Sequence, residues 1–197
     1  MQGQTSIKCS TSEINKKYFE EHPEAKKERE WLNKKSRLAE FNKTAVSTSI
    51  TIPIVFHVND ATNPQKVTLA QVQSAVDILN EDYNGLNPEF NSLRPEFQNI
   101  ASNLEINFCL ASIDPDGNST NGITYHYNSF NGREPNGSGG AVKGVSVWPC
   151  DKYLNVWIVN EVEDDGDLYY SGWAFYPSTS LADQGLDGMV KDLLMFQ

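Results

Sequence analysis

The sequence predicts an α/β (α+β) fold, in which a mixed sheet is backed by a helix and preceded by a helical extension. Residues 49–58 are β-branched and almost continuously apolar, which is typical of a strand buried on both faces. An amphipathic helical pattern follows at residues 68–86, and a second apolar run follows at residues 104–113. This strand, helix, strand order predicts a right-handed crossover between two parallel strands.

The helix at residues 68–86 has clear start and stop signals. Thr68 with Gln71 three positions later is the pattern of a capping box. Apolar residues then recur at helical spacing from Val72 and Val76 onwards, and Gly85 ends the pattern. We therefore expect one apolar face, packed on the sheet.

The later part of the chain predicts further strands. Residues 123–127 alternate in polarity and predict a short exposed strand, whereas the Gly/Ser/Asn-rich residues 129–147 predict a long surface loop. Residues 153–159 predict a third central strand. Residues 172–176 and 188–194 predict two more strands.

The chain divides by charge and composition into a head (residues 1–45) and a body (residues 46–197). Residues 13–41 are rich in Glu and Lys, and Pro23 divides them into two helices that are too polar to join a core. The small polar residues 42–49 predict a linker and a site of proteolytic cleavage.

The head carries ten Lys/Arg against seven Asp/Glu, whereas the body carries six against nineteen. Such an acidic body argues against nucleic-acid or anionic-membrane partners. The sequence contains no run of 18 apolar residues, so it predicts no membrane span. The opening residues lack the apolar stretch of a signal peptide, which we interpret as a mature N-terminus with an added Met.

Three cysteines occur, at Cys9, Cys109 and Cys150. Cys109 lies within a predicted strand and Cys150 just before another, so the two either form a disulfide or are buried free thiols. Cys9 stands apart in a polar segment. It is either inert or a thiolate that can ligate a metal.

Three histidines occur, at His22, His57 and His126, and none is spaced to place two metal ligands on one helix face. This spacing argues against a zinc site built by this chain alone. We expect His57 to be hydrogen-bonded at a sheet edge, and the other two to be solvated.

No nucleophile elbow, phosphate-binding glycine loop or Cys-x-x-Cys motif is present. Asp164, Asp165 and Asp167 surround a glycine. Their carboxylates either bind Ca²⁺ or form a solvated acidic turn.

Several segments in order carry a family resemblance: IPIVFHV, LNEDYNGLNP, FCLASIDPDGNSTNGI, KYLNVW, SGWAFYP and GLDGMV. Together they resemble the pappalysin/cytophagalysin-type zinc metalloproteases of the metzincin clan, across about residues 50–190. The head, with IKCSTSE before a charged helical stretch, resembles the pro-segment of the bacterial members.

The resemblance implies that the body is the upper, N-terminal subdomain of the catalytic domain, with a twisted, mixed, five-stranded sheet and a backing helix. The one antiparallel strand would be the upper rim of the substrate cleft, where a peptide can add as another strand. It would comprise Gly172, Trp173, Ala174, Phe175 and Tyr176. Cys9 matches the pro-segment cysteine that can ligate the catalytic zinc in the zymogen.

The family's zinc helix, HExxHxxGxxH, is absent from these residues, so no catalytic residue can be assigned. The resemblance therefore implies the pro-segment and upper subdomain of a secreted zinc metalloendopeptidase zymogen. We expect this chain to be inactive alone and to be completed by a C-terminal subdomain or a partner. Two alternatives remain: a secreted peptide-binding or adhesion module, and a protease inhibitor or decoy that uses the same sheet.

Overall fold

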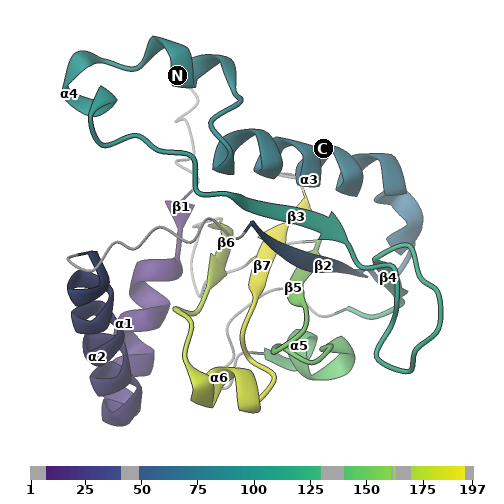
Figure 1. Ribbon diagram of the computed structural model, residues 1–197. Helices are drawn as coiled ribbons and strands as arrows, with labels where there is room; N and C mark the ends of the chain where they lie inside the picture. The colour runs from purple at the N-terminus through teal and green to yellow at the C-terminus, as the bar shows by residue number, and fades with distance from the viewer. Residues whose placement is uncertain (1–7, 41–48, 130–139, 161, 163–169, 194–197) are drawn as a thin grey trace, which may run out of the picture.

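The computed structural model describes residues 8–40, 49–129, 140–160, 162 and 170–193 (Figure 1). In these ranges the chain forms a mixed α/β structure around one seven-stranded sheet. The strands are β1 (Lys8–Cys9), β2 (Ile50–Asn59), β3 (Ile106–Leu110), β4 (Ile123–His126), β5 (Leu154–Val159), β6 (Tyr170–Ala174) and β7 (Met189–Asp192). The helices are α1 (Thr11–Glu21), α2 (Pro23–Glu40), η1 (Pro64–Lys66), α3 (Leu69–Tyr83), η2 (Pro88–Ser92), α4 (Pro95–Gln98), α5 (Gly140–Ser146) and α6 (Thr179–Asp183).

The strand order is β1-β6-β7-β5-β2-β3, with β4 also paired to β2. The path from β6 to β3 contains five of the six strands that the sequence predicts, and β4 is the sixth. β1 from the head and β4 raise the number to seven, which corrects the five-stranded expectation. β6 is antiparallel to β7, and the other pairings are parallel, including the predicted pairing of β2 with β3.

Strand β2 is an interior strand of the sheet and has neighbours along both sides. β5 pairs with its second half, from Ile54 to Asn59. On the other side β3 pairs with β2 up to Ile54, and β4 pairs with it from Phe56 onwards. Because β4 is hydrogen-bonded to β2 and its residues after Ile123 are half-buried, the expectation of an exposed strand is wrong.

Helix α3 covers one face of the sheet, as predicted. Thr68 and Gln71 form the capping box, in which the Gln71 N–H donates to Thr68 Oγ1 at 3.4 Å and the Thr68 N–H donates to Gln71 Oε1 at 2.8 Å. Val72 and Val76 are buried against the sheet. The core on this face comprises Ile54, Phe56, Val58, Val67, Val72, Val76, Phe108, Ile123, Val156, Ile158 and Leu193.

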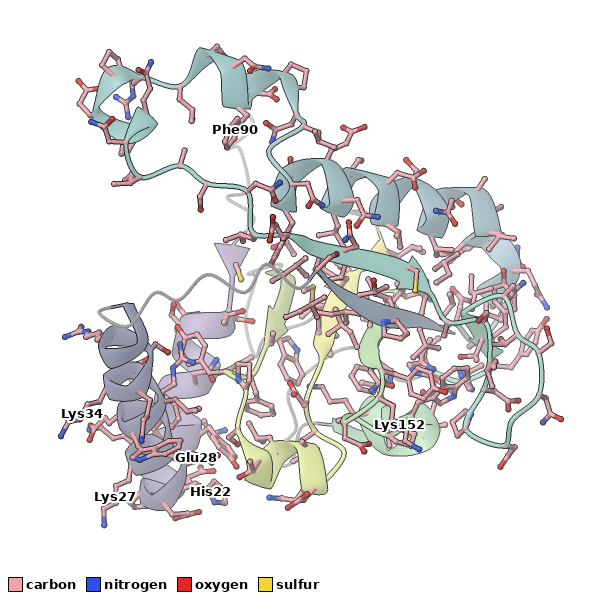
Figure 2. All side chains as sticks on the ribbon, in the orientation of Figure 1. His22, Lys27, Glu28, Lys34, Phe90 and Lys152 are labelled. Atoms are coloured by element: carbon pink, nitrogen blue, oxygen red, sulfur yellow. The ribbon has the colours of Figure 1, made fainter. Side chains whose placement is uncertain are left out.

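The opposite face is covered by α5, α6 and the head. Its core comprises Ile14, Tyr18, Ala25, Val142, Trp157, Val159, Val162, Trp173, Phe175, Leu181 and Val190. Three of these residues belong to the head, so the expectation that the head is too polar to join a core is wrong. The charges lie on its outer side, and Figure 2 shows Lys27 and Lys34 pointing away from the body along α2.

The division of the head at Pro23 is confirmed, because α1 ends at Glu21 and α2 begins at Pro23. The predicted surface loop at residues 129–147 is wrong in its last part, where α5 carries the buried residues Val142 and Lys143. The proposed linker and cleavage site at residues 42–49 lies almost wholly outside the described residues. Among the described helices, none is both long and apolar enough to cross a membrane.

Candidate functional site: the edge strand and the head

Strand β6 is the candidate peptide-binding rim, and its residues are held by the core. Trp173 pairs with Val190 of β7, and its side chain is buried together with that of Phe175. Gly172 has a φ of 151°, and a Cβ at this position would collide with the carbonyl oxygen of Val190. A glycine is therefore required where β6 approaches β7 most closely.

The outer edge of β6 is occupied by the head. β1 pairs parallel to β6, with Lys8 opposite Tyr170 and Cys9 opposite Gly172. The backbone N–H of Ser10 then donates to the carbonyl oxygen of Gly172 at 3.2 Å. The head thus adds a strand at the edge that the sequence predicts for peptide binding.

Two side chains of α1 continue this pairing after β1 ends. The N–H of Ala174 donates to Thr11 Oγ1 at 3.1 Å. Asn15 Nδ2 donates to the carbonyl oxygen of Ala174 at 2.8 Å, and the N–H of Tyr176 donates to Asn15 Oδ1 at 2.7 Å. Sequence reasoning missed both residues, because a single polar side chain in a charged helix carries no signal of its partner.

The aromatic residues next to the rim also contact the head. The rings of Tyr18 and Phe175 lie 4.9 Å apart between centroids, and Phe19 stacks on Tyr176 at 6.3 Å. The guanidinium of Arg29 lies 4.8 Å from the centre of the Tyr176 ring. All five predicted rim residues therefore lie together at the interface between head and body, although β6 itself ends at Ala174.

Cys9 is exposed at the start of the head, beside the rim strand. Its thiol donates to Thr11 Oγ1 at 3.2 Å, within the head itself. Among the described residues, no group of three His, Cys, Asp or Glu side chains is placed to hold a metal ion. Cys9 as a zinc ligand therefore remains a prediction, and the proposed calcium ligands Asp164, Asp165 and Asp167 lie outside the described residues.

The predicted disulfide between Cys109 and Cys150 is not formed, and both are free thiols. Cys109 lies opposite Pro53 of β2, and β5 begins on the far side of β2. Two strand spacings, about 9–10 Å, separate β3 from β5, and Cys150 lies in the segment before β5. Cys109 is also exposed, in contrast to the alternative of two buried thiols.

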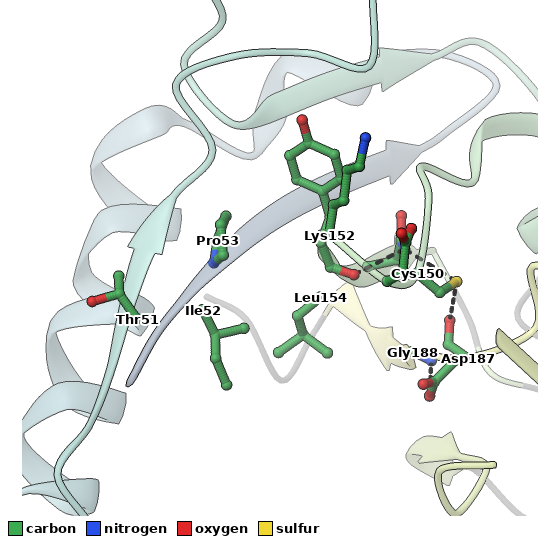
Figure 3. A pocket seen from close by; sticks show the side chains of 11 residues that line it. Thr51, Ile52, Pro53, Cys150, Lys152, Leu154, Asp187 and Gly188 are labelled. Carbon is green, nitrogen blue, oxygen red and sulfur yellow. Dashed lines mark hydrogen bonds between the residues drawn. The ribbon is translucent and has the colours of Figure 1, made fainter. Parts of the chain in front are cut away.

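A cavity of about 290 Å³ lies at the amino ends of β2 and β5 (Figure 3). Pro53, Cys150 and Asp187 are among its lining residues. Burial, and next the negative charge of Asp187, raise the pKa of the Cys150 thiol. This thiol is therefore poorly suited to act as a nucleophile at neutral pH.

His57 is fully buried in the central strand β2, so its predicted place at a sheet edge is wrong, although its hydrogen bonding is confirmed. Its Nε2 lies 2.9 Å from Asn155 Oδ1, which can only accept, so Nε2 carries the proton. Its Nδ1 lies 2.8 Å from Thr124 Oγ1. Burial, against the effect of the Asn155 hydrogen bond, lowers the pKa of His57 to about 4.

The other two histidines, His126 and His22, each have a polar side chain within hydrogen-bonding distance. His126 Nε2 lies 2.8 Å from Thr124 Oγ1, and burial lowers the pKa of His126, so this residue is less solvated than expected. His22 is partly exposed, and its Nδ1 lies 3.2 Å from Glu24 Oε1. Among the described residues, none of the three histidines belongs to a group of three or more His, Cys, Asp or Glu side chains that could hold a metal ion.

Lys143 is a buried cation that sequence reasoning missed. Its Nζ donates to the carbonyl oxygens of Leu186 at 2.6 Å and Gly188 at 3.2 Å. The same nitrogen lies 4.5 Å from the ring centre of Trp173, and 5.1 Å from those of Trp157 and Phe175. Lys143 thereby connects α5 to the rim strand and to the segment before β7.

Comparison with known proteins identifies the family. The Peptidase_M43 family model, described as pregnancy-associated plasma protein-A, matches residues 141–192. Mature mirolysin of Tannerella forsythia in complex with a cleaved peptide is 33% identical with a TM-score of 0.63, over 74% of this chain and 53% of that one. Promirolysin of the same organism, as a mutant, is 29% identical with a TM-score of 0.70, over 94% and 59%. The predicted resemblance to the pappalysin family of metalloproteases is therefore confirmed.

A search of curated proteins gives no match. A mirolysin structure in complex with a small compound is 34% identical to this chain, with a TM-score of 0.62 over 74% of this chain and 53% of that one. The chain thus spans somewhat more than half the length of these solved pappalysin-family relatives. The match to the precursor extends over more of this chain than the matches to the mature enzyme.

Proposed function

We propose that this chain is the pro-segment and upper subdomain of a secreted zinc metalloendopeptidase zymogen. Residues 1–45 are the pro-segment, and residues 46–197 form the upper part of the catalytic domain. The observation that carries the proposal is the head lying along the rim strand β6, in a chain that matches a pappalysin precursor over 94% of its length.

Strand β6 supplies the chemistry for peptide binding. The edge of a strand presents backbone N–H and C=O groups, and an extended peptide can pair with them in place of the head. Removal of the head would also uncover Phe175 and Tyr176, whose rings contact Tyr18 and Phe19. The substrate is therefore a peptide or protein in extended conformation at the rim.

Zinc would be held by residues that follow the rim in the sequence of the complete enzyme. A zinc ion bound there would supply an activated water for hydrolysis of the peptide bond. The described residues of this chain do not by themselves fit a zinc site, and Cys9 is the residue that we propose as an inhibitory ligand in the zymogen. The chain alone is therefore expected to be inactive, and a C-terminal subdomain would complete it.

The test compares the 197-residue chain with the product of the same gene extended past Gln197. We expect the extended reading frame to encode a zinc helix, and its product to hold one zinc and to cleave casein after the head is removed. The shorter chain should hold far less than one zinc and leave casein intact. A stop codon directly after residue 197, combined with peptide binding without cleavage, would instead establish a peptide-binding or adhesion module.

A further inference from the structure

We propose that Asn15 is a latch whose carboxamide imitates the donor and acceptor of a strand residue at the edge of β6, and that it holds the head there without help from the Cys9 thiol. The inference deepens the proposed function, because it assigns the regulation of the rim to a particular side chain. It depends on that function only for the identity of the peptide that the latch excludes.

The hydrogen-bonding pattern of Asn15 is that of a strand residue. In a parallel pair, one residue donates its N–H to a carbonyl oxygen of the neighbour and accepts at its own C=O from the N–H two residues later. The carboxamide of Asn15 does the same, since it donates to Ala174 O and accepts from Tyr176 N. A carboxamide and a peptide unit carry the same donor and acceptor groups.

The orientation of this carboxamide is fixed. Asn15 is 1% exposed, and its Nδ2 also donates to the carbonyl oxygen of Thr11 at 2.7 Å. Both contacts of the nitrogen are carbonyl oxygens, and the contact of Oδ1 is an N–H, so the reversed orientation would oppose like groups at each contact. Buried polar groups with partners of this kind are costly to disrupt.

The latch completes the coverage of four consecutive edge groups on β6. The carbonyl of Gly172 accepts from Ser10, and the N–H of Ala174 donates to Thr11. Asn15 takes the other two groups, Ala174 O and Tyr176 N. An incoming extended peptide needs the same groups, so it competes with the head for them.

Apolar contacts on either side of Asn15 hold α1 at the sheet edge. Ile14 and Tyr18 are buried on the same side of the helix, in the core that also contains Phe175 and Leu181. This burial shields the hydrogen bonds of Asn15 from water. The thiol of Cys9, in contrast, is exposed and donates to Thr11 within the head.

The structure thus separates two roles within the head. The Asn15 latch occupies the rim, whereas among the described residues the hydrogen bond of the Cys9 thiol is to Thr11 within the head. Loss or oxidation of the thiol should therefore leave the rim covered. Disruption of the carboxamide should open the rim while the thiol stays intact.

The test measures hydrogen exchange at the backbone amides of Ala174 and Tyr176 in the 197-residue chain. Asn15→Asp keeps the shape but places a carboxylate oxygen against the carbonyl oxygen of Ala174. We expect the repulsion between these oxygens to displace α1 from the edge, so that exchange at Tyr176 and Ala174 accelerates roughly 10- to 100-fold. Cys9→Ala should leave both rates unchanged, and so should Asn33→Asp, the same substitution at an exposed position of α2.

Unchanged rates in Asn15→Asp, or acceleration in Cys9→Ala, would overturn the proposal. If Asn15→Asp unfolds the body, exchange at Val156 of β5 will rise as well, and Thr11→Val then decides. That variant removes the acceptor that the Ala174 amide shares with the Cys9 thiol, so the Ala174 amide should exchange roughly 10-fold faster while Val156 stays protected. Equal protection of Ala174 in Thr11→Val and in the unmodified chain would exclude the latch.

Exchange needs neither zinc nor cleavage, so these results are independent of whether the complete protein is a protease. A second arm measures binding of an extended fluorescent peptide to the same variants. Tighter binding to Asn15→Asp than to Asn33→Asp would show that peptide and latch share the rim. Accelerated exchange without any gain in peptide binding would keep the latch but refute β6 as a peptide-binding strand.

Discussion

Acidification should destabilise this chain through His57, well above the pH at which its carboxylates become protonated. Burial lowers the pKa of His57 from the ordinary value of 6.5 to about 4 in the folded state. The unfolded chain therefore takes up a proton near pH 6.5, whereas the folded chain does so only near pH 4. The stability contributed by neutral His57 is complete above pH 6.5 and is lost as the pH falls towards 4.

The magnitude follows from the same two values. Each pH unit in this window lowers the free energy of unfolding by about 1.4 kcal/mol, for a total of about 3 kcal/mol. Asp60 contributes in a separate window, because hydrogen bonds from Lys66, Asn63 and Thr62 hold its pKa below the usual range in spite of its burial. Its contribution is lost only as the pH falls below about 4.

Urea unfolding at about pH 7.5 and pH 4.5 tests this reasoning. We compare the unmodified chain with His57→Gln, which does not titrate but can still donate to Asn155. The unmodified chain should lose about 2–3 kcal/mol more than the variant between the two pH values. His22→Gln, at a partly exposed histidine, should behave like the unmodified chain. Equal losses in His57→Gln and the unmodified chain would refute the assigned role of His57.

Three further outcomes are expected. Lys143→Met should lower the free energy of unfolding by roughly 2–4 kcal/mol in urea, because two carbonyl oxygens lose their buried donor; a loss below about 0.5 kcal/mol would contradict this role. Thr68→Ala should cost about 1 kcal/mol by the same assay, since it removes the cap of α3, whereas Thr68→Ser keeps the capping hydroxyl and should cost little. Thiol titration of the unfolded chain without reductant should count three thiols, and a count of one would show a disulfide.

The sequence was sufficient to predict the elements whose signals are local. The capping box at Thr68 and the apolar run of β2 depend on neighbours in sequence, and both are confirmed. The division of the head at Pro23 is local for the same reason, because proline removes a donor and restricts the preceding residue.

The features that sequence reasoning missed depend on contacts between distant segments. Nothing in the sequence places β2 between β3 and β5, which is the arrangement that separates Cys109 from Cys150. The burial of Ile14 and Tyr18 depends on an apolar surface formed about 160 residues later in the chain. The Gly and Ser content of residues 129–147 predicted a loop, but α5 forms there. Its Lys143 is stabilised by the aromatic rings of Trp157 in β5 and Trp173 in β6.

The same is true of the rim. Its antiparallel strand could be placed within two residues from the resemblance, since β6 spans Tyr170–Ala174. The partners of that strand could not be predicted, because the Asn15 carboxamide is recognisable as a strand mimic only once α1 lies beside Ala174. Side chains that replace backbone groups leave no periodic pattern in a sequence.

The pairing of β1 with β6 also determines when the head can dock during synthesis. Cys9 and its partner Gly172 are separated by 163 positions, and β6 is itself paired with β7, which ends at Asp192. At a translation rate of about 5–20 residues per second, the head emerges roughly 10–30 s before its binding edge exists. The head is therefore made before the edge that it binds, so it can close a finished sheet but cannot nucleate one.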